Sequence, residues 1–206
     1  MNFLGSAGYD RGVTDLVAYA LAGGLSTRMG ADKAFLELGG RTLLERALAL
    51  LSEISPEVRI VGAREKFAAY GHVIEDEFPG RGPLGGIHAA LRASRADLNL
   101  ILAVDMPLVE VRFLEYLVKE ARCCSATLTV PRAAGGWQPL CAVYRKEFVE
   151  IAEKALREER NKIDRLFSQV ELRIVEQDEL AKQGFSPEMF HNLNTPQELR
   201  SARALK

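Results

Sequence analysis

The chain has 206 residues, with 27 lysine or arginine and 28 aspartate or glutamate residues, so its formal net charge is −1. A near-neutral chain gives no indication of a nucleic-acid or anionic-membrane partner, and we expect neither. Three cysteines, two of them adjacent, are typical of neither a zinc site nor a disulfide framework, and we therefore expect a cytoplasmic protein.

The length predicts one domain over residues 1–206, large enough to bury a full hydrophobic core. We expect residues 1–14 to be disordered, and with Asp10 and Arg11 and no long apolar core they do not resemble a signal peptide. Continuous aliphatic runs then predict buried strands at 16–21, 58–61, 98–104, 126–130 and 172–175. Such runs are typical of a parallel sheet covered on both faces.

Helical patterns separate these runs. Apolar residues recur at helical spacing after position 42, and Thr42 and Glu45 stand where a capping box would begin that helix. Similar patterns predict helices over 111–120 and 147–156. The alternation predicts an α/β fold, in which an open, mostly parallel twisted sheet carries helices on both faces.

The segment "LAGGLSTRMGADK" follows the first predicted strand. It matches neither the ATPase P-loop nor the dinucleotide fingerprint, because no Gly-Lys-Ser/Thr run follows and its first glycines are adjacent. Glycine backbone amides together with Arg28 and Lys33 indicate a binding site for a polyanion. The alternative is a strand-to-helix turn whose glycines only supply positive φ angles.

Asp105 ends the strand "LNLILAVD", and the carboxyl ends of strands are where open α/β sheets bind ligands. A carboxylate there could hold Mg²⁺ together with substrate phosphates. The alternative is an N-cap for the helix expected after Pro107.

Two further motifs allow both a functional and a structural interpretation. "GPLGG" places Pro83 at a helix start, and Gly85 and Gly86 in its first turn permit either close approach of a ligand or tight packing on the sheet. In "NLNTPQEL", a helix start at Thr195 explains the later residues but not Asn192 and Asn194, whose alternative role is contact with a ligand.

These segments resemble the molybdenum cofactor guanylyltransferases. The resemblance is carried by "LAGGLSTRMGADKAFLELGGRTLLERAL", "GPLGGI", "AVDMPL" and "NLNTPQEL", in the family's order, from position 17 to 199. It implies a nucleotide-diphospho-sugar-transferase-like fold. It also implies a Mg²⁺-dependent transfer of GMP from GTP to the phosphate of Mo-molybdopterin, with release of pyrophosphate.

The resemblance also implies roles for individual residues. Those that match the family's nucleotide-binding positions are Leu21, Ala22, Gly23, Lys33, Asp76 and Asp105, and Asp105 also matches the Mg²⁺ ligand. Asn192 and Asn194 match paired asparagines near the pterin substrate. Because the attacking phosphate is largely deprotonated at neutral pH, no general base is needed, and Arg28, Lys33 and Asp105 would catalyse by alignment and charge neutralisation.

The sequence also departs from the family. Thr27 replaces a frequent arginine, Ala31 a frequent glycine, and "VDMP" a more usual cysteine-aspartate-threonine-proline. Gly62 stands near the position of a family asparagine that touches nucleotide. These differences concern contacts to base and phosphate, and they leave the reaction class unchanged.

Three other functions are considered. A molybdopterin cytidylyltransferase would have the same fold but tends to carry aspartates at positions 192 and 194, and a sugar-phosphate nucleotidylyltransferase is usually longer. A catalytically silent GTP-binding regulatory domain would not need Arg28, Lys33 and Asp105 together. The expected partners are GTP and Mo-molybdopterin, and beyond these a GTP-binding accessory protein and recipient molybdoenzymes.

Overall fold

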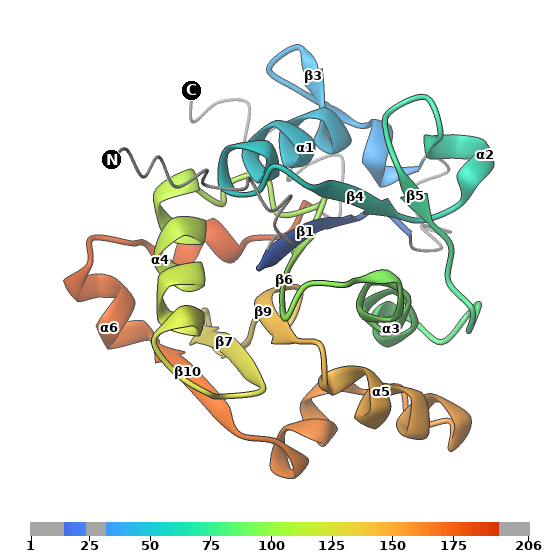
Figure 1. Cartoon of the computed structure of the whole chain (residues 1–206). Helices are drawn as coiled ribbons and strands as arrows, with labels where there is room; N and C mark the ends of the chain where they lie inside the picture. Colours follow the sequence, from blue (N-terminus) through green and yellow to red (C-terminus); the bar gives the residue numbers. More distant parts are fainter. Residues whose placement is uncertain (1–14, 24–31, 194–206) are drawn as a thin grey trace, which may run out of the picture.

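The computed structural model describes residues 15–23 and 32–193 (Figure 1). The expectation of disorder at 1–14, the roles given to Arg28 and Asn194, and the helix start at Thr195 lie outside these residues. None of the helices in the described ranges combines the length and apolar character that a membrane span requires.

One eight-stranded sheet organises the described part of the chain, in the order β10-β7-β9-β6-β1-β4-β5, with β8 paired to β7. Its strands are β1 (Leu16–Leu21), β4 (Val58–Val61), β5 (Val73–Ile74), β6 (Leu98–Ala103), β7 (Leu128–Ala133), β8 (Gly136–Trp137), β9 (Cys141–Arg145) and β10 (Leu172–Glu176). Along the main path β9 runs antiparallel to its neighbours β6 and β7, while the other pairs are parallel. The separate two-stranded ribbon consists of β2 (Glu37–Leu38) and β3 (Arg41–Thr42).

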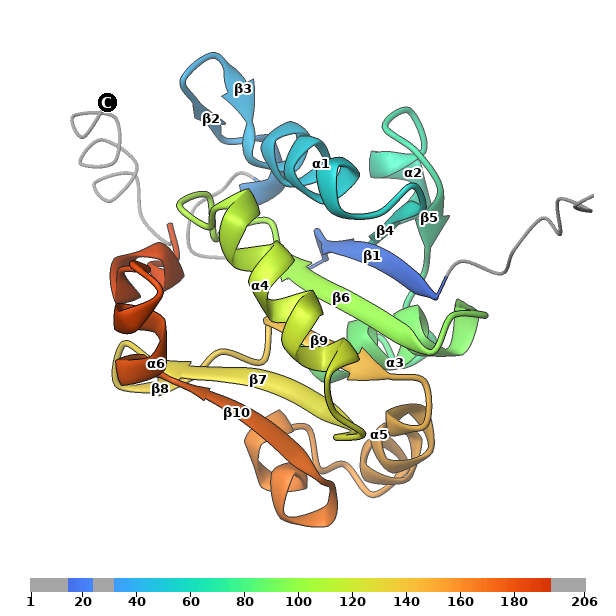
Figure 2. The same ribbon diagram turned by 60° about the vertical axis from the view of Figure 1, so that its left-hand side comes forward.

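Helices cover both faces of the sheet (Figures 1 and 2). They are α1 (Leu43–Ile54), α2 (Arg64–Phe67), α3 (Pro83–Ala93), α4 (Val111–Arg122), α5 (Phe148–Arg157) and α6 (Gln177–Lys182), with 3-10 turns η1 (Lys33–Phe35), η2 (Ile163–Gln169) and η3 (Pro187–Phe190). In β1, Ala18 and Ala20 face the core under α1 and α4, whereas Val17 and Tyr19 face the core under α3 and α5. Both side-chain sets are buried, which explains why the strand is apolar at every position.

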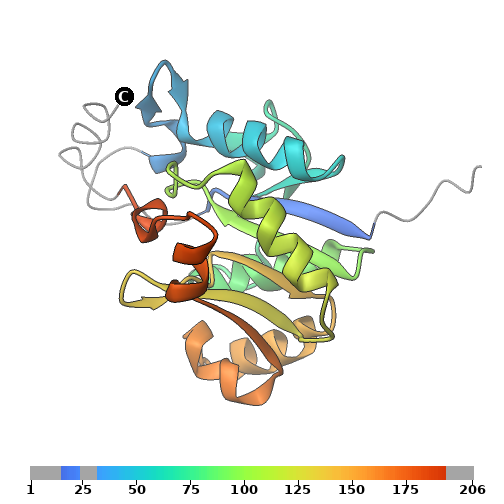
Figure 3. The same cartoon turned by 90° about the vertical axis from the view of Figure 1, so that its left-hand side faces the viewer.

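Parallel strands give the sheet two distinct edges. We call the edge where they begin the amino edge and the edge where they end the carboxyl edge. The β7–β8 hairpin and η3 lie at the carboxyl edge, on the same side of the molecule (Figure 3). The loops that follow β1, β5 and β6 therefore converge there.

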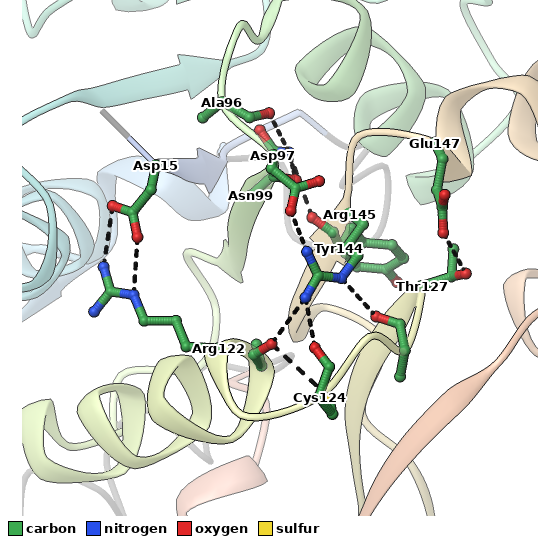
Figure 4. A network of polar contacts seen from close by, with 12 residues as sticks. Asp15, Ala96, Asp97, Asn99, Arg122, Cys124, Thr127, Tyr144, Arg145 and Glu147 are labelled. Atoms are coloured by element: carbon green, nitrogen blue, oxygen red, sulfur yellow. Dashed lines mark hydrogen bonds and ion pairs between the residues drawn. The ribbon is translucent and has the colours of Figure 1, made fainter. Parts of the chain in front are cut away.

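The amino edge is closed by a network around Arg145, the last residue of β9 (Figure 4). Its guanidinium donates to the carbonyls of Ala121, Cys124 and Ala126 at 3.2, 2.6 and 3.2 Å, and it pairs with Asp97. These bonds join the end of α4, the loop before β6 and the loop before β7. Arg145 thereby supplies charged donors to carbonyls at the point where these elements meet.

Asn99 and Lys146 extend the closure of this edge. The Asn99 amide donates to the carbonyls of Asp97 and Tyr144 at 3.1 and 3.3 Å. Lys146 Nζ donates to the carbonyls of Arg92 and Ser94 at 3.2 and 2.8 Å, at the carboxyl end of α3, where a cation is favoured. Burial lowers the pKa of the Lys146 ammonium group.

The fold class expected from the sequence is confirmed, as are strands 16–21 and 58–61 and the capping box at Thr42 and Glu45. The strand expected at 126–130 is wrong in its bounds, because β7 spans Leu128–Ala133. The antiparallel β9 was not predicted.

Candidate functional site

At the carboxyl edge, the residues that follow β1 contact the last residue of β4. The amides of Ala22 and Gly23 both donate to the carbonyl of Val61, at 2.9 and 3.1 Å. A Cβ on Gly23 would lie 3.6 Å from the Cα of Gly62, which is ordinary van der Waals contact. The two hydrogen bonds to Val61 therefore join the backbones at the point where the loop leaves the sheet, and a side chain at position 23 would fit there.

Lys33 and Asp105, 72 residues apart in the chain, form an ion pair at this edge, with Lys33 Nζ 3.1 Å from Asp105 Oδ2. Their side chains are 26% and 18% exposed. A pair so far removed from solvent is less screened by water and salt than a surface pair. The structure thus joins two of the residues that sequence reasoning singled out separately.

Asp32 places Lys33. Its carboxylate caps η1 by accepting from the Ala34 amide at 3.2 Å, and it also accepts from Lys66 Nζ at 2.9 Å. Asp32 is not among the site residues predicted from the sequence, although an aspartate directly before a short helical turn is a capping signal. The cap defines where η1 begins, and Lys33 is its first residue.

Asp105 stands where β6 ends, and its main chain is held on two sides. The preceding residue, Val104, donates to the carbonyl of Leu21 at 3.2 Å, and the amide of Leu193 donates to the carbonyl of Asp105 at 2.9 Å. The alternative interpretation as the cap of the following helix is wrong, because α4 begins at Val111 and Glu110 is its N-cap residue. The carboxylate is paired with Lys33 instead.

Asp76 follows β5, and its carboxylate lies against the first turn of α3. The amide of Phe78 donates to Asp76 Oδ1 at 2.7 Å. A Cβ built on Gly85 would come within 2.4 Å of Oδ2 and 2.7 Å of Oδ1 of Asp76. Gly86, by contrast, faces Val61, whose Cγ1 would lie 3.3 Å from an added Cβ.

The two glycines of "GPLGG" therefore have different surroundings. Gly86 supports the packing interpretation, because it lies where α3 meets β1 and β4. Gly85 supports close approach of a carboxylate, but the carboxylate belongs to the protein's own Asp76. This contact was not predicted from the sequence, because nothing in the spacing of positions 76 and 85 indicates it.

Gly62 explains one departure from the family. A Cβ there would meet the ring of Phe67 at 2.6 and 2.8 Å, so the aromatic ring of α2 occupies the space that a side chain would need. Phe67 is 1% exposed and cannot move away without disturbing the core. An asparagine at position 62 is therefore incompatible with this packing.

Asn192 lies one residue before the amide that binds Asp105. Its side-chain Oδ1 is buried and has no hydrogen-bond partner in the described ranges. Unsatisfied buried polar atoms are uncommon in folded proteins. Among the site residues predicted from the sequence, the structure thus brings Lys33, Asp105 and the Asn192 segment together, with Leu21, Ala22, Gly23 and Asp76 along the same edge.

The donor set at this edge fits a magnesium ion held jointly with a ligand. Within the described ranges, no three His, Cys, Asp or Glu side chains gather as a metal site would require. Mg²⁺ commonly takes only one or two protein carboxylates and completes its octahedron with phosphate oxygens and water. Asp105, partly buried and carrying a hard carboxylate, meets that requirement.

The chain is similar to known nucleotidyltransferases. Residues 18–174 match the family model described as the MobA-like NTP transferase domain. A probable molybdenum cofactor guanylyltransferase of Carboxydothermus hydrogenoformans is 34% identical over 183 residues, covering 88% of this chain and 92% of that protein. One from Pelotomaculum thermopropionicum is 35% identical over 187 residues, covering 90% of each.

A solved structure is also similar. The crystal structure of molybdopterin-guanine dinucleotide biosynthesis protein A from Archaeoglobus fulgidus superposes with a TM-score of 0.79 at 28% sequence identity. The match covers 91% of this chain and 97% of that one. The similarity therefore extends over almost the full length of both proteins.

Proposed function

This chain belongs to the MobA-like NTP transferase family and is a nucleotidyltransferase, and we propose that it transfers GMP from GTP to the phosphate of Mo-molybdopterin. The observation that carries the proposal is the Lys33–Asp105 pair at the carboxyl edge, which unites a cation for phosphates with a carboxylate for Mg²⁺. The names of the relatives support the choice of substrates.

GTP would lie along the carboxyl edge between β1 and α3. Leu21, Ala22 and Gly23 would contact the guanine nucleotide through the closely spaced backbone at the end of β1. Asp76, which follows β5, would contact it beside the first turn of α3, and Lys33 would bind the phosphates. Arg28, outside the described residues, is proposed as a second cation for the phosphates.

Asp105 would hold the magnesium ion against the phosphates of GTP. When bound, Mg²⁺ would neutralise phosphate charge and stabilise the pyrophosphate leaving group. Lys33 pairs with Asp105 in the structure, so the carboxylate is not left with an uncompensated charge at a partly buried position. On binding of nucleotide, Lys33 would exchange this partner for phosphate oxygens.

The reaction needs no general base from the protein. A phosphate oxygen of molybdopterin forms a bond to the α-phosphorus of GTP, and the bond from that phosphorus to the α–β bridging oxygen breaks. Pyrophosphate leaves with the bridging oxygen. Since the attacking phosphomonoester has a second pKa of about 6, it is already largely deprotonated at neutral pH. The protein then contributes alignment and charge neutralisation.

The pterin substrate would approach Asp105 from the side of the Asn192 segment. The buried Oδ1 of Asn192 has no hydrogen-bond partner among residues 15–23 and 32–193, and this supports the proposal because a bound substrate or water would complete its hydrogen bonding. Asn194, outside the described residues, is proposed as the second of the pair.

We further propose action in the cytoplasm, with a GTP-binding accessory protein and molybdoenzymes that receive the product.

A nucleotide panel tests the proposal. The protein is incubated with Mg²⁺, Mo-molybdopterin and GTP, CTP, ATP or UTP, and pyrophosphate release is measured. We expect clear preference for GTP, with guanine dinucleotide as the product. Faster turnover with CTP would move the protein to the cytidylyltransferases, and binding of GTP without pyrophosphate release would indicate a regulatory domain.

A further inference from the structure

The carboxylate of Asp76 lies in a space that exists only because residue 85 has no side chain. Apart from Gly85, its chain neighbours and the adjacent α3 backbone, the three heavy atoms nearest to a Cβ built on Gly85 all belong to Asp76: Oδ2 at 2.4 Å, Oδ1 at 2.7 Å and Cγ at 2.9 Å. Real Cβ atoms essentially never approach other heavy atoms within 3.0 Å. Both oxygens of the carboxylate therefore lie directly against the α3 backbone.

Gly85 is not required by its own backbone conformation. It is the third residue of α3, and it is not among the glycines with positive φ. Glycine in a helix costs stability relative to alanine, so a glycine here needs another reason. The contact with Asp76 supplies that reason.

The position of Asp76 is well defined on its other sides too. The Phe78 amide holds Oδ1 at 2.7 Å, and the amino end of a helix favours a nearby negative charge. A methyl group at position 85 would displace the Asp76 carboxylate from this position. The far end of an aspartate side chain can rotate, so the variant would fold while the carboxylate moves.

We propose that Gly85 is a positioning residue that sets the place of the Asp76 carboxylate for nucleotide binding. The proposal rests on the proposed function, in which Asp76 contacts GTP. Gly85 acts through Asp76 and need not touch the nucleotide itself. Its effect must therefore disappear when the Asp76 carboxylate is absent.

A double-mutant cycle tests this with the full chain: wild type, Gly85→Ala, Asp76→Ala and the double variant, with the Kd for GTP and Mg²⁺ measured by calorimetry. Because a charge-assisted contact is lost, we expect the Kd for GTP to rise ~10-fold or more in either Gly85→Ala or Asp76→Ala. The double variant is expected to bind no more weakly than Asp76→Ala. Gly86→Ala, whose added Cβ would meet Val61 instead of Asp76, is the matched control, and its effect should be additive with Asp76→Ala.

Melting temperatures of the same proteins test the steric contact between residues 76 and 85 separately from its consequence for GTP binding. Gly85→Ala should lower Tm when Asp76 is present and raise it when residue 76 is alanine, because alanine favours helix once the clash is gone. Wild-type GTP affinity in Gly85→Ala, or equal weakening in both backgrounds, would overturn the positioning role. Wild-type affinity in Asp76→Ala would overturn the role of Asp76 in nucleotide binding, and with it the consequence drawn for Gly85. The Tm cycle would then still decide whether the steric contact exists.

Discussion

At the amino edge of the sheet, Arg145 and Lys146 donate to main-chain carbonyls from elements that meet there. At the carboxyl edge, Lys33 and Asp105 hold each other, and Asn192 buries an amide oxygen with no partner in the described ranges. One set of cations thus satisfies the protein's own backbone. Lys33 is instead paired with the carboxylate of Asp105. Under the proposed function, Lys33 would exchange this partner for phosphate and Asp105 would bind Mg²⁺.

The difference follows from what each edge must do. Hydrogen bonds to backbone carbonyls can be fully satisfied in the folded chain and need not change, so they stabilise it permanently. Groups that bind a ligand have to exchange partners, so their pairing in the free protein is limited to few, replaceable contacts. Substitutions at the amino edge should therefore cost stability, and substitutions at the carboxyl edge should cost function.

The largest functional effect is expected for Asp105→Asn. Asparagine keeps the shape but removes the charge, and a neutral amide oxygen is a poorer ligand for Mg²⁺. Pyrophosphate release should fall by ~100-fold or more, the size of effect seen when one group that stabilises transition-state charge is removed. Pyrophosphate release is measured over a Mg²⁺ titration, and an unchanged Tm would show that the variant is folded. Near-wild-type turnover at the Mg²⁺ concentration that saturates the wild type would contradict the role of Asp105 as the Mg²⁺ ligand.

Arg145→Ala should have the largest effect on stability. The change leaves several carbonyls of the amino edge without a charged donor, and we expect the free energy of unfolding to fall by about 3 kcal/mol. Arg132→Ala is the control, because its ion pair with Glu176 is about half exposed and should contribute at most ~1 kcal/mol. Denaturant unfolding measures both, and equal losses would contradict the distinction between the edges.

Much of this arrangement could be predicted from the sequence. The buried strands are continuous apolar runs, and Lys33 and Asp105 each follow such a run, so both were placed at the carboxyl edge. β9 was not predicted, because periodicity alone does not distinguish a short apolar run from a buried segment of helix. The contact of Asp76 with Gly85 depends on how β5 and α3 pack, and local sequence does not encode that distance.

Lys33→Ala should weaken nucleotide binding and leave stability nearly intact. Removal of a cation from the triphosphate is expected to cost about 1.5–3 kcal/mol of binding free energy. Loss of the partner of Asp105 also leaves that carboxylate unpaired in the free protein, which should lower Tm slightly. Calorimetry with GTP and Mg²⁺ provides the measurement. Unchanged affinity and rate in a folded variant would show that the pair with Asp105 is only structural.

Asn192→Ala should have the smallest effect. It is expected to raise the KM for Mo-molybdopterin by a few-fold, roughly the loss of one hydrogen bond of about 1 kcal/mol, and to leave the Kd for GTP unchanged. Steady-state kinetics with each substrate varied in turn distinguish the two constants. A variant that only melts earlier, with both constants at wild-type values, would reduce the segment to a structural turn.

Amide hydrogen exchange of the wild-type protein, with and without saturating GTP and Mg²⁺, tests the central claim most directly. Nucleotide at the carboxyl edge should slow exchange in residues 76–86 and 103–107, while residues 94–98 and 121–127 at the amino edge exchange as before. Protection at the amino edge, or no protection at the carboxyl edge under saturating GTP, would contradict the division of the sheet into a stabilising edge and a nucleotide-binding edge.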